Sequence, residues 1–339
     1  MKSYVPSTTL HLEFLRSKGV AIIFLANLAF QNSCADSSCW QRTIFERAWT
    51  FEDVHGVSER HVFAISSQAG GVYSYDGKNW RLMPDSPTNL SIFSLSPASI
   101  YVGYSYFDGS RWSNLLENPF RISDIWAESE ERVFFVGGST SLDNGSVNAR
   151  IFHCNRLNCE EIANDFHTVL QGLWGSSATD VYAVGTDEEL STSKAGMILH
   201  YDGVSWSVMK DDIPYGLFGV WGTSSTDVFA VGDNCHILHY DGIEWREMET
   251  PCQGDWIRRL ESVWGASGTQ VYAGGGASLY YDGNLWKDIT EGVPAYVESI
   301  WGTSATNLFF VGSVFGEHYQ PVGIILQYTC PEPGMLWKP

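Results

Sequence analysis

VWGTSSTDVFAVG, residues 220–232, decides the fold, because the chain repeats it. The same pattern returns as LWGSSATDVYAVG at 173–185 and as IWGTSATNLFFVG at 300–312. Self-similarity of this kind is the sequence signature of a repeat architecture, in which one small unit is copied along the chain. What one unit builds therefore determines the whole fold.

One full unit, residues 217–249, contains four short runs: LFGVWG, TDVFAVG, HILHYDG and EWREME. Each run is rich in β-branched or aromatic residues and is bounded by Gly, Asp or Ser, which is typical of a β-strand. The Asp-Gly between the third and fourth runs indicates a tight hairpin. Four antiparallel strands in succession form a meander, which is one blade of a propeller.

The Trp-Gly and Tyr-Asp-Gly signatures divide the chain into seven units at spacings of 33 to 48 residues, a size typical of propeller blades. The first strands of the units centre on His55, Phe93, Trp126, Trp174, Trp221, Trp264 and Trp301. We predict an all-β fold: a single seven-bladed β-propeller domain over residues 36–339, built of four-stranded antiparallel blades.

The hairpin signature, an aromatic residue followed by Asp-Gly-x-x-Trp, occurs five times, at 75–80, 107–112, 201–206, 240–245 and 281–286. Because its two aromatic residues recur in almost every unit, we interpret them as a cross-strand packing pair and not as a sugar platform. We also expect the polar residue before the second strand to cap the preceding turn with its own side chain. This residue is Asp180, Asp227 or Asn307.

In the third unit, two cysteines replace the aromatic pair. Cys154 falls on the Tyr position and Cys159 on the Trp position, and residues opposite each other across a hairpin are close enough for a disulfide. In the fifth unit, Cys235 begins the third strand and Cys252 follows the fourth, so antiparallel pairing brings them together. We predict both disulfides.

The seventh unit lacks a fourth strand of its own. Its third strand, 323–330, carries Tyr328 on the Tyr position, but no Asp-Gly follows. Two segments offer the missing strand: CWQRTIF (39–45) from the N-terminal side and MLWKP (335–339) from the C-terminal side.

We favour the N-terminal segment for two reasons. Trp40 precedes the next first strand by the same fourteen residues as Trp286 does. The pairing also brings Cys39 to Cys330, and a disulfide across so long a loop is expected to be strongly stabilising. Strand exchange between the two ends of the chain would then close the ring.

Charge and composition narrow the range of partners. Of 339 residues, 17% are charged, and the formal net charge is −19. Nucleic acid and anionic membrane surfaces would repel such a protein. Cations, basic partners and neutral ligands stay compatible with it.

Residues 1–35 are predicted to be an export signal. Lys and Arg residues up to position 18 precede an apolar run of twelve residues, 19–30, which is too short to span a bilayer and suits a signal-peptide core. Two processing routes stay open: cleavage after Ala35, or lipidation of Cys34. We expect an extracytoplasmic protein, either secreted or a periplasmic or outer-membrane lipoprotein.

The repeat VWGTSSTDVFAVG…ILHYDGIEW resembles the Trp-Gly and Tyr-Asp-Gly propeller repeats common in secreted and lipid-anchored proteins of myxobacteria and their relatives. The resemblance covers roughly residues 46–330 and is most specific in the last four units. It implies a propeller in the envelope of a Gram-negative bacterium, without an assigned activity. A looser likeness to the Asp-box of sialidase-type propellers differs in spacing, since Asp-Gly-x-x-Trp stands where that motif has Ser-x-Asp-x-Gly-x-x-Trp.

Function is expected where the units differ. Second-to-third-strand loops and the loops between blades share one face of a propeller, and the insertions concentrate there. They are 137–150, 185–196, 312–323 and the inter-blade loop 249–261. Loops on a rigid scaffold commonly carry binding sites.

An aromatic residue stands five to eight positions before most first-strand centres, and two arginines share these loops. The candidate ligand-binding residues are Trp49, Phe120, Phe166, Tyr215, Trp256, Tyr296, Arg258 and Arg259. The aromatic side chains either ring the mouth of the central channel and stack on a planar ligand such as a sugar, or wedge between adjacent blades.

The same loops carry acidic residues. Asp143, Asp187, Glu188 and Glu189 are weak candidates for Ca²⁺, which prefers such hard oxygen ligands. No run matches a known calcium motif, so solvated loop charge is the better interpretation. We predict no other cofactor.

Catalysis has little support in the sequence, which contains no metal-hydrolase motif, nucleophile elbow or phosphate-binding loop. His153, His200 and His239 share one position of the repeat, which indicates a structural role. The leading hypothesis is a monomeric, non-catalytic binding propeller for a protein or a cell-surface glycan. The alternative is a sialidase-like glycan-cleaving enzyme, which would need arginines around carboxylates with perturbed pKa values.

Overall fold

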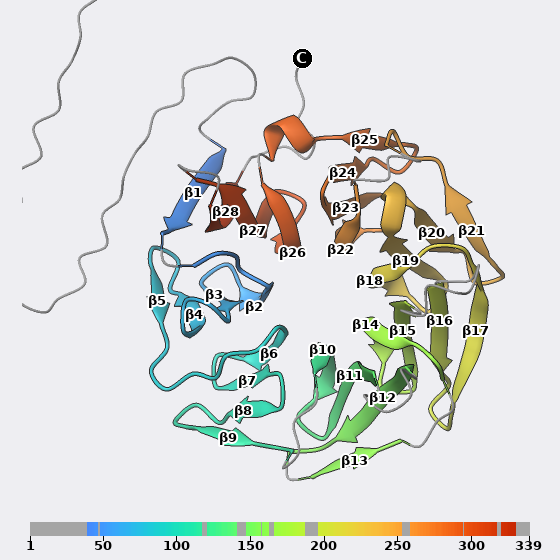
Figure 1. The fold of residues 1–339 in the computed structure, drawn as a ribbon, viewed down its shortest axis with the longest axis horizontal. Coiled ribbons are helices and arrows are strands. Elements are labelled where there is room, and N and C mark those ends of the chain that lie inside the picture. Colours follow the sequence, from blue (N-terminus) through green and yellow to red (C-terminus); the bar gives the residue numbers. More distant parts are fainter. Residues whose placement is uncertain are drawn as a thin grey trace, which may run out of the picture. The chain divides into compact units, whose positions relative to one another are not determined.

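The computed structural model describes residues 39–329 except 47, 117–120, 141–146, 157, 163–165, 187–195, 253–257, 294 and 317–319. These residues form seven four-stranded antiparallel sheets placed around a ring (Figure 1). The predicted seven-bladed β-propeller is confirmed.

Six blades follow the chain in order. Blade 1 consists of β2 (Asp53–Ser58), β3 (His61–Ser66), β4 (Gly71–Tyr75) and β5 (Trp80–Leu82). Blade 2 consists of β6 (Ile92–Ser96), β7 (Ser99–Val102), β8 (Ser105–Phe107) and β9 (Trp112–Asn114). Blade 3 consists of β10 (Ile122–Ser129), β11 (Arg132–Thr140), β12 (Val147–Cys154) and β13 (Cys159–Glu161).

The second half repeats this plan. Blade 4 consists of β14 (Val169–Ser177), β15 (Asp180–Thr186), β16 (Gly196–Tyr201) and β17 (Trp206–Ile213). Blade 5 consists of β18 (Leu217–Ser224), β19 (Asp227–Gly232), β20 (Ile237–Tyr240) and β21 (Trp245–Met248). Blade 6 consists of β22 (Leu260–Ser267), β23 (Gln270–Gly275), β24 (Ser278–Tyr281) and β25 (Trp286–Asp288). Two short 3₁₀ turns, η1 (Asp233–Cys235) and η2 (Thr290–Gly292), lie in the loops of blades 5 and 6.

Blade 7 takes strands from both ends of the chain. β26 (Tyr296–Ser304), β27 (Asn307–Phe315) and β28 (Pro321–Thr329) are completed by β1 (Trp40–Phe45), which pairs with β28 (Figure 1). The predicted strand exchange is confirmed.

Its register is also as predicted. Trp40 lies opposite Tyr328, and their ring centroids are 5.0 Å apart. The N–H of Thr329 donates a hydrogen bond to the carbonyl of Cys39 at 2.9 Å. Cys39 is disulfide-bonded, and Cys330, its predicted partner, lies outside the described residues, as does 335–339.

The aromatic hairpin pairs pack as expected. Tyr75 lies opposite Trp80 with ring centroids 5.0 Å apart, and the intervening loop has four residues. The Asp76 carboxylate accepts hydrogen bonds from the backbone N–H groups at 78 and 79, while Gly77 takes a φ of +91° that favours glycine. Asp-Gly is therefore required by the loop, and the aromatic pair serves as scaffold.

Both predicted hairpin disulfides are present. Cys154 and Cys159 occupy opposite positions of the β12–β13 hairpin, with Cα atoms 4.0 Å apart. In blade 5, a disulfide joins Cys235, which precedes the third strand, to Cys252, which follows the fourth strand. Their Cα atoms are 5.7 Å apart. In blade 3 the disulfide replaces the aromatic pair.

The Trp-Gly dipeptide joins neighbouring blades. The ring of Trp221 in blade 5 lies against Gly265 of blade 6, where an added Cβ would lie 2.5 Å from it. The same contact joins blade 7 to blade 1, where a Cβ on Gly56 would lie 2.7 Å from Trp301. Because no side chain fits, each unit needs both residues: Trp for the next blade and Gly for the preceding one.

At two blade junctions both residues of this contact are replaced, the Trp of one blade and the Gly of the next. Blade 1 has His55 in place of Trp, and blade 2 has Ser94 in place of Gly; His55 Nδ1 lies 2.9 Å from Ser94 Oγ. Blade 2 has Phe93, and blade 3 has Ala127, in the same apolar cluster. A smaller ring thus stands beside a larger neighbour, which keeps the interior close-packed.

The two sides of the ring differ in construction. One side, the turn face, carries the first-to-second and third-to-fourth turns of each blade, which touch each other: a Cβ on Gly242 would lie 2.8 Å from the Thr226 side chain. The other side, the loop face, carries the second-to-third loops and the loops between blades. In blade 5 these are joined by the hydrogen bond from Cys235 N–H to the Arg258 carbonyl.

Among the described residues, no helix is long and apolar enough to cross a membrane.

Candidate functional site

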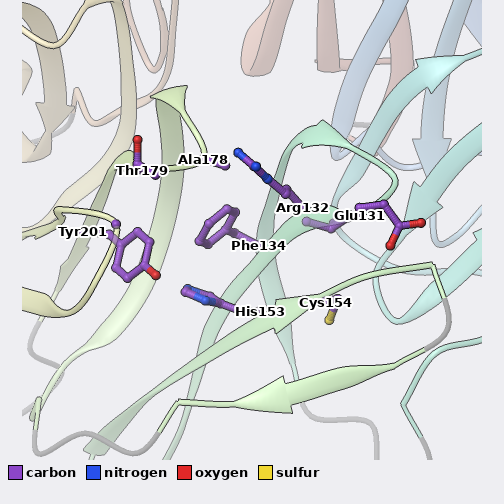
Figure 2. Close-up of a pocket in the computed structure, with 10 residues that line it drawn as sticks. Glu131, Arg132, Phe134, His153, Cys154, Ala178, Thr179 and Tyr201 are labelled. Carbon is purple, nitrogen blue, oxygen red and sulfur yellow. The ribbon is translucent and has the colours of Figure 1, made fainter.

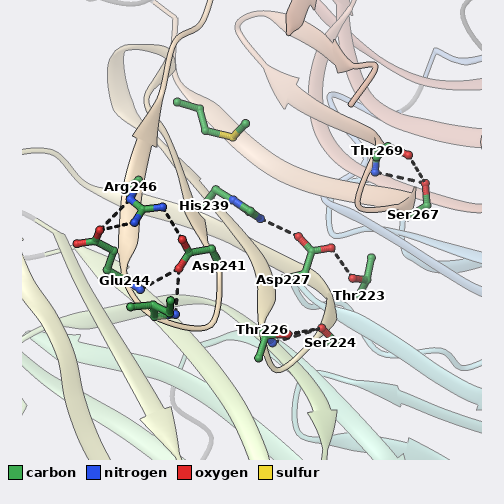
Figure 3. A network of polar contacts seen from close by, with 12 residues as sticks. Thr223, Ser224, Thr226, Asp227, His239, Asp241, Glu244, Arg246, Ser267 and Thr269 are labelled. Carbon is green, nitrogen blue, oxygen red and sulfur yellow. Dashed lines mark hydrogen bonds and ion pairs between the residues drawn. The ribbon is translucent and has the colours of Figure 1, made fainter. Parts of the chain in front are cut away.

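A polar network on the turn face links three strands within a blade (Figure 3). In blade 5, Asp227 Oδ1 lies 2.7 Å from His239 Nε2, and Thr223 Oγ1 donates to Asp227 Oδ2 at 2.5 Å. In blade 4, Asp180 makes the same contacts with His200 and Ser176. The repeated histidines are therefore structural, as their shared position indicates.

The expected turn cap was assigned to the wrong residue. The Ser at the end of the first strand caps the turn: Thr226 N–H donates to Ser224 Oγ at 3.3 Å, and Thr269 N–H to Ser267 Oγ at 3.4 Å. Asp227 instead points across the sheet, because its carboxylate finds a hydroxyl on one neighbouring strand and an imidazole on the other. In blade 7, Asn307 Oδ1 is buried without a hydrogen-bond partner.

A cavity of about 270 Å³ opens between blades 3 and 4 on the turn face. Figure 2 shows Phe134, His153 and Tyr201 gathered around it. Arg132 takes the place that Asp227 has in blade 5, so His153 lacks a carboxylate and accepts a hydrogen bond from Trp206 Nε1 at 3.3 Å. Burial lowers the pKa of His153 to about 4, so the ring stays neutral and serves packing.

Two buried carboxylates on the innermost strands join blades. Asp53 accepts hydrogen bonds from Ile92 N–H of blade 2 at 2.8 Å and from the Ser299 hydroxyl of blade 7 at 2.7 Å. Asp124 accepts one from Leu173 N–H of blade 4 at 2.7 Å. Burial raises the pKa of Asp53 to about 6 and raises that of Asp124 as well. Their acceptors are occupied within the scaffold.

Three successive blades place a glutamate three residues before the first-strand centre. Glu261 and Glu298 lie at β-bulges of β22 and β26, and Glu52 holds the same position in blade 1. Glu52 accepts hydrogen bonds from Ser67 N–H and Oγ at 3.0 and 2.5 Å. Glu261 accepts one from the Tyr296 hydroxyl at 2.5 Å.

Glu298 differs from the other two. No described residue forms a hydrogen bond or an ion pair with it. Burial, followed by the charges of Glu261 and Glu52, raises its pKa to about 7, while Arg259 opposes the rise. Glu298 is therefore a half-buried carboxylate whose acceptor capacity the described scaffold leaves unused.

Glu298 lines a cavity of about 590 Å³ on the loop-face end of blade 7. The lining residues come from β1, β26, β27, β28 and the loop before β26: Arg42, Ala295, Tyr296, Glu298, Ser313, Val314, Phe315 and Pro321. Phe315 is 80% exposed and Tyr296 37%, and Trp49 in the loop between β1 and β2 is 59% exposed. Among the described residues these are the exposed large aromatic side chains, and all three belong to blade 7 or its junction with blade 1.

The other predicted aromatic residues serve packing where they are described. Tyr215 is buried, and its ring stacks on His236 at 3.9 Å between centroids. Phe166 packs, partly buried, against the cluster between blades 3 and 4. Phe120 and Trp256 lie outside the described residues.

The two predicted arginines are engaged by carboxylates. Arg258 lies 2.9 Å from Asp288. Arg259 lies 3.1 Å from Asp233 and 3.6 Å from Glu261, and its guanidinium covers the Phe218 ring at 4.0 Å from the centroid. An arginine cluster that receives an anionic substrate would need free guanidinium groups, so this arrangement does not favour the sialidase-like alternative.

The calcium candidates Asp143, Asp187, Glu188 and Glu189 and the lipidation candidate Cys34 lie outside the described residues. Among the described residues, no group of three or more His, Cys, Asp or Glu side chains is placed to hold a metal ion.

Of the eight residues that line the blade 7 cavity, only Tyr296 was a candidate from the sequence, and the missed ones include Phe315, Glu298 and Arg42. Phe315 lies in a predicted insertion, 312–323, but was not singled out. Glu298 had a detectable signal, since an acid recurs at one position in units six, seven and one. Arg42 lies in the predicted closing strand, 39–45, but nothing in the sequence indicated that its side chain lines a cavity.

No family model matches the chain, and no curated protein matches it in sequence. Solved structures are similar in fold. "YCF48 bound to D1 peptide" has a TM-score of 0.61 and 16% identity, and covers 88% of this chain and 99% of that chain. "YCF48 from Cyanidioschyzon merolae" has a TM-score of 0.60 and 14% identity, and covers 86% of this chain and 98% of that chain.

A propeller of another kind is similar to the same degree. The WD40 β-propeller domain of Doa1 has a TM-score of 0.61 and 12% identity, and covers 87% of this chain and 97% of that chain. At such low identity the likeness concerns the fold. This chain is therefore similar to the YCF48 and WD40 structures in its propeller fold, over most of the length of each chain.

Proposed function

We propose that this protein is a non-catalytic binding propeller that recognises a segment of a partner protein at the loop-face end of blade 7. The observation that carries the proposal is the cavity of about 590 Å³ beside the exposed rings of Phe315 and Tyr296. Cavities of this size, with an apolar wall and few polar groups, are typical ligand sites. Exposed aromatic residues are enriched at protein interfaces.

The similar structures support a protein partner, since one of them is described as bound to a peptide. The chemistry on the turn face supports a scaffold role, because its carboxylates and imidazoles are paired with each other in blades 4 and 5. We further propose that the protein works outside the cytoplasm, which agrees with its disulfides and its signal-like N-terminus.

Selection from a displayed library of random peptides tests the proposal, with two matched variants. Phe315→Ala removes an exposed apolar side chain from the loop face, and Ile243→Ala removes one, 83% exposed, from the turn face. We expect peptides that bind the parent protein and the Ile243 variant equally and lose affinity for the Phe315 variant. Absence of any selected peptide, or equal binding to all three proteins, would contradict the proposal.

A glycan array run on the same three proteins separates the other class of ligand. Saccharide binding that is lost in the Phe315 variant but kept in the Ile243 variant, with no peptide selected, would favour glycan recognition instead, since sugars also stack on exposed aromatic rings.

A further inference from the structure

We propose that the blade 7 cavity is a pocket for a basic side chain, a lysine or an arginine of the partner segment, which pairs with Glu298 while apolar atoms beside it pack on Phe315. This inference rests on the proposed function and names the partner chemistry of the same site. Four features of the described residues lead to it.

The first feature is the unused carboxylate. Glu52 and Glu261 hold the same position of the repeat, and each accepts hydrogen bonds from its own surroundings. Glu298 accepts none from any described residue, although it is half-buried. A buried acceptor without a donor costs free energy, and a donor brought by a ligand removes that cost.

The second feature is the sign of the local charge. Glu298 is influenced by Glu261 and Glu52, both of which oppose its ionisation. Arg259 is the cation whose charge favours ionisation of Glu298, but it is already shared between Asp233 and Glu261. A cation in the cavity would therefore relieve repulsion among three carboxylates, and the net charge of −19 attracts such a partner over longer distances.

The third feature is the wall of the cavity. Val314, Phe315 and Pro321 give it an apolar side, and Phe315 stands largely exposed. Lysine and arginine side chains have apolar stems that pack on such surfaces while the charged head finds a polar group. The exposed Phe315 ring also offers a face for a cation.

The fourth feature is the opposite charge at the outer side. Arg42 of β1 lines the same cavity. It would repel a second cation and attract a carbonyl or a carboxylate of the partner backbone. The charges of the pocket therefore suit a single basic side chain in an extended segment and do not suit a run of lysines.

The charges that act on the cavity set its pH dependence. Among the described residues they are Glu298, Glu261, Glu52, Arg259 and Arg42, with the Tyr296 hydroxyl beside them. Because the pKa of Glu298 is raised to about 7, ionisation increases between pH 6 and pH 8. Binding of a basic side chain should therefore strengthen as the pH rises over this range, by about tenfold for a fully coupled group.

The test uses the selected peptides, restricted to those without histidine. We expect enrichment of lysine or arginine at one position, and a loss of affinity of about tenfold or more in Glu298→Gln, because a charge-assisted hydrogen bond is lost. Glu291→Gln, an exposed glutamate in η2, is the control and should change nothing. The affinity of the Glu298 variant should no longer depend on pH between 6 and 8.

The two proposals fail in different ways. Peptides that require Phe315 but carry no basic residue, or that bind Glu298→Gln as well as the parent, would overturn the basic pocket and leave the binding site in place. Selection of no peptide at all would remove both. A normal unfolding transition of Glu298→Gln shows that a loss of affinity comes from the site and not from the fold.

Discussion

The turn face and the loop face of the ring are built from the same strands, yet they differ in how their polar groups are used. On the turn face, Asp227 binds Thr223 and His239 within its own blade, and the arrangement is repeated in blade 4. On the loop face, the equivalent glutamates of blades 6, 7 and 1 have different surroundings, and Glu298 has no described partner. Repetition indicates a contact that the scaffold needs, and a break in repetition indicates a residue available for a ligand.

The junctions between blades show why repetition persists. Each Trp contacts a Gly of the next unit, so a change in one unit is tolerated only with a change in its neighbour. His55 with Ser94, and Phe93 with Ala127, are such paired changes. Departures from the repeat in the core therefore occur in compensating pairs, whereas departures on the loop face, such as Phe315, need no compensation.

The largest effect is expected where the turn face meets the core. Trp206 is buried and packs against Phe134 of blade 3 and Tyr201 of its own blade. Trp206→Ala should reduce the free energy of unfolding by about 3–5 kcal/mol, because it leaves a large cavity between two blades. Chemical denaturation measures the free energy of unfolding of the variant. A loss below about 1 kcal/mol would show that the hairpin pair is not a scaffold element.

The Trp-Gly junction can be tested by copying a natural departure into a regular blade. Gly265→Ala should destabilise by about 1–3 kcal/mol, because the new Cβ overlaps Trp221. Adding Trp221→Phe reproduces the Phe93–Ala127 combination and should recover part of the loss. A double-mutant cycle measures the coupling between the two sites, and strictly additive effects would contradict the paired origin of the departures.

The aromatic hairpin pair could be foreseen from the sequence because it is periodic, whereas the repeated Trp-Gly dipeptide did not reveal that its two residues contact neighbouring blades. The spacing of Trp40 predicted the strand exchange, and the positions of Cys154 and Cys159 predicted a disulfide, since each occupied a known place in a repeated hairpin. The role of Asp227 was not predictable in the same way. A turn cap and a cross-strand bond require the same residue type at the same position, and only the orientation of the side chain distinguishes them.

The sequence could predict which face of the ring carries the candidate site, but not most of the residues that line it. The insertion 312–323 pointed to the loop face of blade 7. Glu298 was missed because its raised pKa depends on burial in the folded ring and on the charges of Glu261 in blade 6 and Glu52 in blade 1, of which Glu52 lies far away in the sequence. For Tyr215 the sequence left both a ligand-facing and a packing role open, and the stacking contact with His236, which follows the η1 loop, shows that the ring serves packing.

The buried carboxyl of Asp53 makes the stability of the scaffold depend on pH. Asp53→Asn should destabilise by about 1–3 kcal/mol, because an amide cannot accept all the hydrogen bonds from Ile92, Ser299 and Val54. Burial raises the pKa of Asp53 from 3.8 to about 6, so the folded state holds the proton more tightly than the unfolded chain. The contribution of this group to stability is therefore full below pH 4 and is lost as the pH rises through 6.

Unfolding curves between pH 4 and 7 measure this loss. The parent protein should lose more stability over that range than the Asp53→Asn variant, in which the titrating group is absent. An equal slope in the two proteins would show that Asp53 is already ionised throughout.

A moderate effect is expected for the polar network of the turn face. Asp227→Ala removes the acceptor of Thr223, which is exposed, and the partner of His239, which is only partly buried. The loss should be about 1–2 kcal/mol, in line with two hydrogen bonds of which water replaces a part. Asp180→Ala in blade 4 should cost the same, and very different values would show that the two blades do not use the network alike.

The smallest effect on stability is expected on the loop face, where it best distinguishes the two sides of the ring. Phe315 is 80% exposed at the end of β27, so Phe315→Ala should change the free energy of unfolding by no more than about 0.5 kcal/mol. The same substitution should abolish peptide binding at blade 7, whereas Trp206→Ala should weaken binding only as far as it unfolds the protein. A large stability loss in Phe315→Ala would mean that this side chain belongs to the scaffold. The loop face would then not differ from the turn face at the residue on which the proposed binding site depends.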